Sequence, residues 1–105
     1  MTTKKIKSKS SATKSGKKTL VHASGDQCFW ANDGKIITNI VELRDALSKM
    51  DEVVFVHHVT KNKNDFADWV HHVLQDAELA VSIRSAKKPH TARLAVVRRL
   101  REYDI

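Results

Sequence analysis

The lysines of this chain are the side chains best suited to binding a polyanion. Seven of them fall within the first 18 residues, without a single acid. The remaining residues include 12 basic and 12 acidic side chains, so the net charge of +7 resides in this segment. Lysine ammonium groups neutralise phosphates and release counterions without a defined geometry. The candidate nucleic-acid contacts are Lys4, Lys5, Lys7, Lys9, Lys14, Lys17 and Lys18.

A second basic segment lies near the end of the chain, where residues 84–101 hold seven Lys and Arg and no acid. Arginines on a helix can add bidentate phosphate contacts, and Arg93, Arg98 and Arg101 are the candidates. No helix-turn-helix, zinc-finger, RNA-recognition or KH motif accompanies them, which favours backbone binding over sequence readout. The charges predict non-enzymatic, sequence-tolerant association with DNA or RNA. Under the alternative interpretation the tail confers solubility or localisation, and the arginines pair with the acidic middle of the domain.

Acids and histidines offer a weaker pattern along one predicted helix and its continuation. Asp65, Asp68, His72 and Asp76 follow one another at i, i+3, i+7 and i+11, a stripe that could hold a divalent ion. A solvated polar face explains the same residues, and no His-Glu-x-x-His or Cys/His spacing is present. We therefore assign no metal and no cofactor. Lacking also a nucleophile elbow or a phosphate-cradling glycine loop, the sequence does not predict an enzyme.

The residues Trp30 and Lys63-Asn64-Asp65 support a second hypothesis, a protein-interaction domain that docks a partner. An exposed tryptophan could be a stacking or docking platform, and a buried one is a core anchor. The core role is favoured for Trp69, which lies on an apolar helix face, and also for Trp30. Locally, the Lys63–Asp65 triplet is a helix start with an acid near the positive helix end. A docking surface is equally compatible with it.

Patterning along the chain predicts the elements that position these residues. The turn signal Asn32-Asp33-Gly34 separates two short strand candidates and predicts a β-hairpin. Residues 51–59 fit either a strand or a short helix, and Pro89 is expected to interrupt the helical region. Helices are expected from the caps Asn39, Asn64 and Asp76, and a last helix over residues 91–103.

These elements predict a mostly α-helical single domain over residues 24–105, with four to five short helices and an N-terminal β-hairpin. Residues 1–23 are expected to form a disordered lysine-rich tail, because Lys, Ser, Thr and Gly bury too little apolar surface to offset the entropy of ordering. The single cysteine, Cys28, excludes an internal disulfide and suits a reducing compartment. With no secretory signal and no apolar run long enough for a membrane, we expect a cytoplasmic protein without membrane partners.

Residues 28–86 resemble a small prokaryotic family of domains of unknown function. The pattern is Phe-Trp-x-x-x-Gly followed by a Leu-x-x-Ala-Leu helix and His-Val-x-x-x-Lys-Asn-Asp-Phe-Ala-x-Trp-Val, of which the Lys63–Val70 string is the most specific part. The resemblance implies a compact, mostly helical domain and favours a helix over residues 51–59. It implies no activity, cofactor or catalytic residue. The lysine tail and the arginine-rich C-terminal helix fall outside the pattern.

Overall fold

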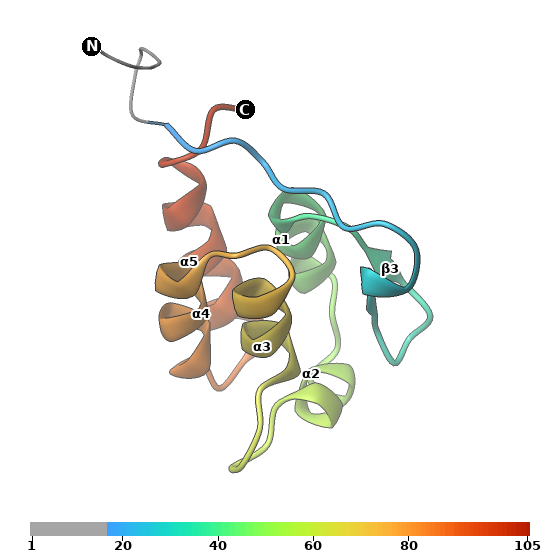
Figure 1. Cartoon of the computed structure of the whole chain (residues 1–105). Coiled ribbons are helices and arrows are strands. Elements are labelled where there is room, and N and C mark those ends of the chain that lie inside the picture. Colours follow the sequence, from blue (N-terminus) through green and yellow to red (C-terminus); the bar gives the residue numbers. More distant parts are fainter. Residues whose placement is uncertain (1–16) are drawn as a thin grey trace, which may run out of the picture.

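The computed structural model describes residues 17–105, a mostly helical domain (Figure 1). Within these residues, five α-helices follow a 3₁₀ turn and a two-stranded antiparallel hairpin, which confirms the predicted fold class. The tail lysines Lys4, Lys5, Lys7, Lys9 and Lys14 lie outside the described residues. The elements are η1 (Gly25–Gln27), β2 (Phe29–Trp30), β3 (Ile36–Ile37), α1 (Ile40–Ser48), α2 (Glu52–His58), α3 (Asp65–His72), α4 (Ala77–Arg84) and α5 (Pro89–Leu100).

The hairpin forms where the Asn-Asp-Gly signal predicts it. Gly34, at φ 95°, adopts the left-handed conformation that glycine accommodates at no steric cost. Phe29 pairs with Ile37 and Trp30 with Ile36. Because successive side chains of a strand point to opposite faces, the first pair is buried while Trp30 and Ile36 are 62% and 49% exposed. The expectation that Trp30 belongs to the core is therefore wrong.

Three helices begin at side-chain caps, as predicted. The side-chain oxygens of Asn39, Asn64 and Asp76 each accept a hydrogen bond from a backbone N–H three residues ahead, at 2.9 to 3.0 Å. Each bond satisfies one of the N–H groups that a helix start leaves without a partner. These caps fix where α1, α3 and α4 begin and how each chain segment enters its helix.

Residues 51–59 form a helix, α2, as the resemblance implied. Phe55 and His58, three residues apart, are buried on one side, whereas Val53 and Val56 are exposed. The β-branched run favours a strand by propensity, but the period of burial is that of a helix. Tertiary packing of Phe55 against Phe66 therefore decides the conformation.

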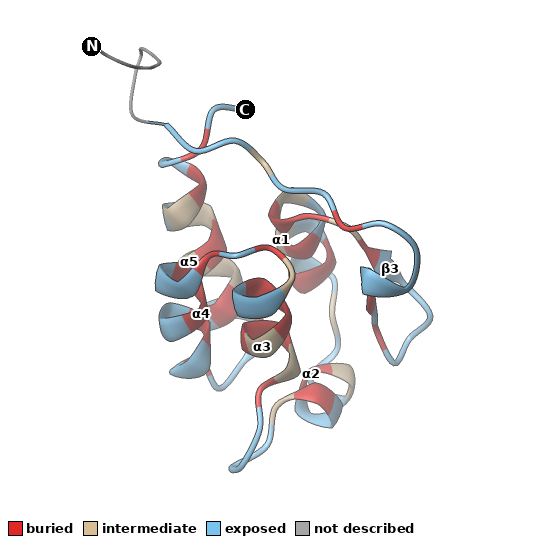
Figure 2. Cartoon of the chain, in the orientation of Figure 1, coloured by how far each residue is buried: buried red, intermediate tan, exposed pale blue. Residues whose placement is uncertain are grey.

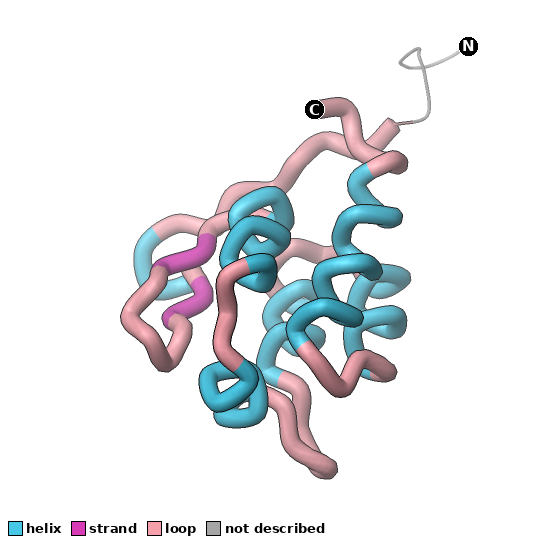
Figure 3. The backbone as a smooth tube through the Cα atoms, turned by 180° about the vertical axis from the view of Figure 1, so that it is seen from behind, coloured by secondary structure: helices cyan, strands magenta, loops and turns pink. Residues whose placement is uncertain are grey.

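The core lies between the helices, whose buried faces point toward one another (Figure 2). α1 packs on α5, α5 on α4, and α4 on α3. The hairpin lies at the edge of this helical body, as the view from behind shows (Figure 3). There Phe29 stacks on Phe66 and meets Trp69 edge to face, which joins the hairpin to α3. No helix among residues 17–105 is long and apolar enough to cross a membrane.

The two ends of the domain differ from the expected bounds. The helical region is interrupted before Pro89 as predicted, since α4 ends at Arg84 and Lys88 is extended. Pro89 itself begins α5, two residues before the predicted start, because proline's fixed φ suits the first helical position. The helix ends at Leu100, three residues before the predicted end. Residues 17–23 belong to the folded domain, not to a free tail, since Ala23 is buried and its N–H donates to Thr38 O at 2.7 Å.

Candidate nucleic-acid interface

Lys17 and Lys18, the last two residues of the lysine-rich segment, are held against the C-terminal end of α5. Lys18 forms a parallel β-bridge with Tyr103, in which its N–H donates to Glu102 O at 2.7 Å. Its carbonyl accepts from Asp104 N at 2.8 Å. Beside it, Lys17 Nζ donates to Arg101 O at 2.9 Å. The chain therefore leaves the domain on its N-terminal side at the same place where α5 ends (Figure 1).

A buried polar cluster fixes the end of α5 in that position. The Tyr103 hydroxyl donates to Asp76 Oδ2 at 2.7 Å, and Arg99 Nε donates to the same oxygen at 2.9 Å. The other carboxylate oxygen of Asp76 caps α4 through Leu79 N. Every acceptor of this buried carboxylate is thus engaged, and α4, α5 and the segment after α5 are tied at one point.

Two pKa values follow from this cluster. Burial by itself raises the pKa of Asp76, but the hydrogen bonds from Arg99, Leu79 N–H and Tyr103 outweigh it and hold the pKa below its ordinary value. Burial and the hydrogen bond to Asp76 raise the pKa of the Tyr103 phenol far above its ordinary value. The cluster is therefore a carboxylate, a guanidinium and a neutral phenol over the whole physiological pH range.

The predicted arginine contacts separate into two places. Arg98 and Arg101 are exposed, three residues apart at the end of α5 that Lys17 and Lys18 adjoin. Arg93 is half-buried and faces a cavity at the other end of the helix, near α1. The structure thus brings four of the predicted contacts together and leaves Arg93 apart from them. Two exposed acids, Glu102 and Asp104, lie at the same end of the domain.

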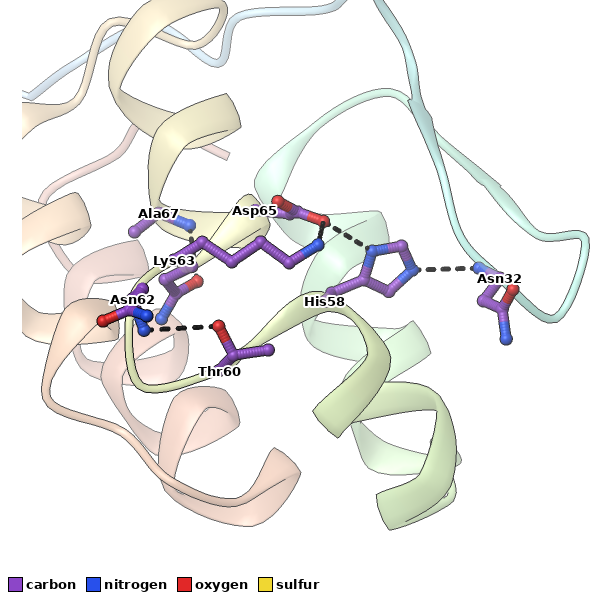
Figure 4. Close-up of polar contacts among 8 residues, drawn as sticks. Asn32, His58, Thr60, Asn62, Lys63, Asp65 and Ala67 are labelled. Atoms are coloured by element: carbon purple, nitrogen blue, oxygen red, sulfur yellow. Dashed lines mark hydrogen bonds and ion pairs between the residues drawn. The ribbon is translucent and has the colours of Figure 1, made fainter.

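The residues of the alternative docking surface have mostly structural roles. Asn64 is buried, because it caps α3 and also donates to Ile83 O at 3.1 Å. Asp65 accepts from His58 Nδ1 at 3.0 Å and from Lys63 Nζ at 3.3 Å (Figure 4). Asn64 is therefore removed from any docking surface. Of the four residues predicted for it, Trp30 is the one with a large exposed apolar side chain.

His58 connects α3 to the hairpin, and its contacts determine its tautomer. Its Nε2 accepts from the backbone N–H of Asn32 at 3.0 Å, so this nitrogen carries no proton (Figure 4). The neutral ring must then carry its proton on Nδ1, which donates to Asp65. Because both ring nitrogens are engaged, His58 is a structural link rather than a general base.

The acidic stripe considered as a metal site is not assembled. Asp65 pairs with His58 and Lys63, Asp68 pairs with Arg84 at 2.7 Å, and Asp76 is buried against Arg99. Within residues 17–105, no group of three or more His, Cys, Asp or Glu side chains could hold a metal ion. Each carboxylate of the stripe instead joins two elements of the fold.

Sequence reasoning gave no role to Arg99 and Tyr103, although they bind the buried carboxylate. Their spacing of four residues would place them on one face of the helix expected over residues 91–103, but α5 ends at Leu100 and Tyr103 lies beyond it. Asp76 was recognised as a helix cap and as a member of the acidic stripe. Nothing in the local sequence shows that its second oxygen meets the far end of the last helix.

Comparisons with known proteins add no assignment. No protein-family model matches the chain, and no curated protein or solved structure shows significant similarity to it. The resemblance over residues 28–86 stays a prediction.

Proposed function

We propose that this protein associates with the phosphate backbone of DNA or RNA, non-enzymatically and without sequence readout. The supporting observation is the bridge between Lys18 and Tyr103. It holds the last residue of the lysine-rich segment at the end of α5 that carries Arg98 and Arg101. Lysines, which neutralise phosphates without a defined geometry, and arginines, which add bidentate contacts, then act at one end of the domain. Five further lysines precede Lys17 and Lys18 in the sequence.

The local charge balance assigns the main role to the lysines. The end of α5 also carries two exposed acids, Glu102 and Asp104, so its four basic residues Lys17, Lys18, Arg98 and Arg101 leave a local charge of about +2. Arg99 contributes little, because it pairs with Asp76 and Glu78. The larger part of the positive charge therefore comes from the five lysines that precede Lys17 in the sequence. We expect Arg98 and Arg101 to orient the nucleic acid and the lysines to supply most of the salt-dependent affinity.

The test is fluorescence anisotropy of the full chain with labelled duplex DNA and single-stranded RNA over a salt series. Replacing Lys4, Lys5, Lys7, Lys9 and Lys14 by Gln should lower the slope of log K against log salt by up to about 4 units on duplex DNA. The matched variant with Arg at the same five positions should keep the slope. These residues precede the anchored segment, so neither variant alters the bridge to Tyr103.

A second pair of variants tests the folded part of the interface. Arg98→Gln with Arg101→Gln should remove up to about 2 further units of slope, whereas Lys49→Gln, a surface change on α1's C-cap, should remove none. If the unmodified chain fails to bind at low salt, the proposal is wrong. It is also wrong if the Gln variants bind with an unchanged slope.

One observation favours protein docking as a second candidate function. Trp30 and Ile36 form an exposed cross-strand apolar pair on the outer face of the hairpin. Trp is among the residues enriched at the centres of binding interfaces. Binding to a protein partner would then survive high salt and be lost on Trp30→Ser, while the five-lysine Gln variant would leave it unchanged.

A further inference from the structure

A cavity of about 360 Å³ lies between the end of α1, the α1–α2 connection and the beginning of α5. Its volume falls in the range typical of small-molecule sites. It is distinct from the proposed nucleic-acid interface, since the two lie at opposite ends of α5. Nothing in the fold described above uses it.

Arg93 gives this cavity its chemical character. Its Nε is the one buried side-chain polar atom within residues 17–105 that lacks a hydrogen-bond partner. Buried polar atoms are nearly always paired, so an isolated one calls for a specific explanation. Of the ion pairs within residues 17–105, none includes the Arg93 guanidinium. A guanidinium at a cavity wall with free donors fits a planar or tetrahedral oxyanion.

The other lining side chains define the charge and the polarity of a ligand. Lys88 and His90 add two basic groups, and Glu52 is the single acid. Leu47, Met50 and Pro89 form an apolar wall. Ser48 is less available, because its hydroxyl donates to Asp45 O at 2.7 Å. One end of a matching ligand is therefore strongly anionic and the other apolar.

A second basic hollow, of about 170 Å³, fits a ligand less well. It is lined by Lys61, Lys63, Arg84 and Lys87. Two of these cations are already neutralised, Lys63 by Asp65 and Arg84 by Asp68. Half of its positive charge is thus neutralised within the fold, whereas Arg93 forms none of the ion pairs within residues 17–105.

We propose that the cavity between α1 and α5 binds a small organic phosphate, with the phosphate on Arg93, Lys88 and His90. A phosphate monoester carries about 1.5 to 2 negative charges at pH 7, which suits several basic groups around one acid better than a carboxylate does. The apolar part of the ligand lies against Leu47, Met50 and Pro89. Glu52, at the rim of the same cavity, opposes the anion and weakens binding.

The test uses NMR on the full ¹⁵N-labelled chain, observing the Arg93 Nε–H signal and the backbone amides. The probes are phenyl phosphate, inorganic phosphate, benzoate and a short oligonucleotide. Phenyl phosphate should shift the Arg93 Nε–H and the amide of His90 saturably, and more tightly than inorganic phosphate or benzoate. The oligonucleotide distinguishes a nucleic-acid phosphate from a small phosphate as the source.

Two variants, one that removes a positive charge and one that removes a negative charge, should change phosphate affinity in opposite directions. Arg93→Gln should weaken phenyl phosphate binding at least about tenfold, since a charged hydrogen-bonding pair is lost. Glu52→Gln should tighten it about two- to fivefold, because a like charge near the ligand is removed. Glu52 is exposed, so this variant decides the question even if Arg93→Gln does not fold.

The proposal is overturned if phenyl phosphate shifts only lysine signals of the N-terminal segment, or if Arg93→Gln binds it as the parent does. It is also overturned if Glu52→Gln leaves its affinity unchanged, or if the oligonucleotide alone shifts the Arg93 signal. Nucleic-acid binding through the lysines should persist in Arg93→Gln, so failure of this site and failure of the proposed function are separable.

Discussion

The Tyr103 hydroxyl donates a 2.7 Å hydrogen bond to Asp76, a carboxylate that also caps α4. Through this contact the end of α5 is fixed to the start of α4, and the segment containing Lys18 is held next to it. The position of the proposed interface therefore depends on one buried carboxylate.

Replacing Asp76 by Asn should lower the free energy of unfolding by about 3 kcal/mol, because it leaves Arg99 without its buried partner. The wild-type stability from Asp76 is fully present above the ordinary carboxyl pKa of 3.8. Since folding lowers this pKa, that stability is lost as the pH falls through 3.8 toward the folded-state value. Urea unfolding between neutral and acidic pH measures both effects.

The control for this variant is Glu78→Gln, which removes the exposed partner of the same arginine. Exposed pairs contribute little, so we expect a change of no more than about 1 kcal/mol. An Asp76→Asn protein as stable as Glu78→Gln, with an unchanged acid profile, would contradict the role given to the cluster.

Tyr103→Phe should cost about 1.5 kcal/mol at neutral pH, because Asp76 loses one donor while keeping two. The folded-state pKa of this phenol lies above its ordinary value of 10.0, so its contribution is present below that pH and is lost as the pH rises beyond it. Alkaline unfolding followed by tryptophan fluorescence, which both proteins retain, should show this loss in the wild type. An equally steep alkaline loss in Tyr103→Phe would refute the assignment, since Tyr103 is the only tyrosine.

Lys18→Pro should destabilise the bridge to Tyr103 by about 1 kcal/mol, because proline cannot donate to Glu102 O. Lys18→Gln removes the charge and keeps the backbone donor, so it should leave the bridge intact. Hydrogen exchange of the Asp104 amide, which donates to Lys18 O, compares the two variants. Equal protection of this amide in both would show that the bridge is not formed in solution.

His58→Phe should lower the free energy of unfolding by about 2 kcal/mol, although it keeps an aromatic ring against Phe29 and Phe66. The loss comes from the Asn32 N–H and the Asp65 carboxylate, which both lose a partner. Faster exchange of the Asn32 amide should accompany it. A slow Asn32 amide in the variant would mean that this N–H does not depend on His58.

The two tryptophans should respond very differently to truncation. Trp69→Ala should cost about 4 kcal/mol, since it empties a buried site and removes the hydrogen bond from Nε1 to Gln27 O at 2.8 Å. Trp30→Ala should change stability by about 0.5 kcal/mol or less, because that side chain is mostly exposed. Urea unfolding of both variants checks this, and a large loss in Trp30→Ala would mean that the hairpin face is covered in solution.

Local patterns were sufficient for most of the fold. Asn39, Asn64 and Asp76 marked three helix starts, because a cap acts on the N–H groups next to it in the chain. Asn-Asp-Gly marked the hairpin turn, because the positive φ of Gly34 is likewise a local property of the chain. Trp30 was assigned to the core incorrectly, since the sequence of a two-residue strand does not show which face meets the helices.

The contacts at the candidate sites could not be predicted from local sequence patterns. The concentration of lysines and the separation of charge along the chain are properties of the sequence alone, and they predict polyanion contacts from the N-terminal lysines and the C-terminal arginines. Only the tertiary structure placed Lys18 against Tyr103, buried Asp76 beneath Arg99 and turned Arg93 toward a cavity by α1. These contacts join residues far apart in the chain, so they depend on how the helices pack and not on the local spacing that sequence patterns record.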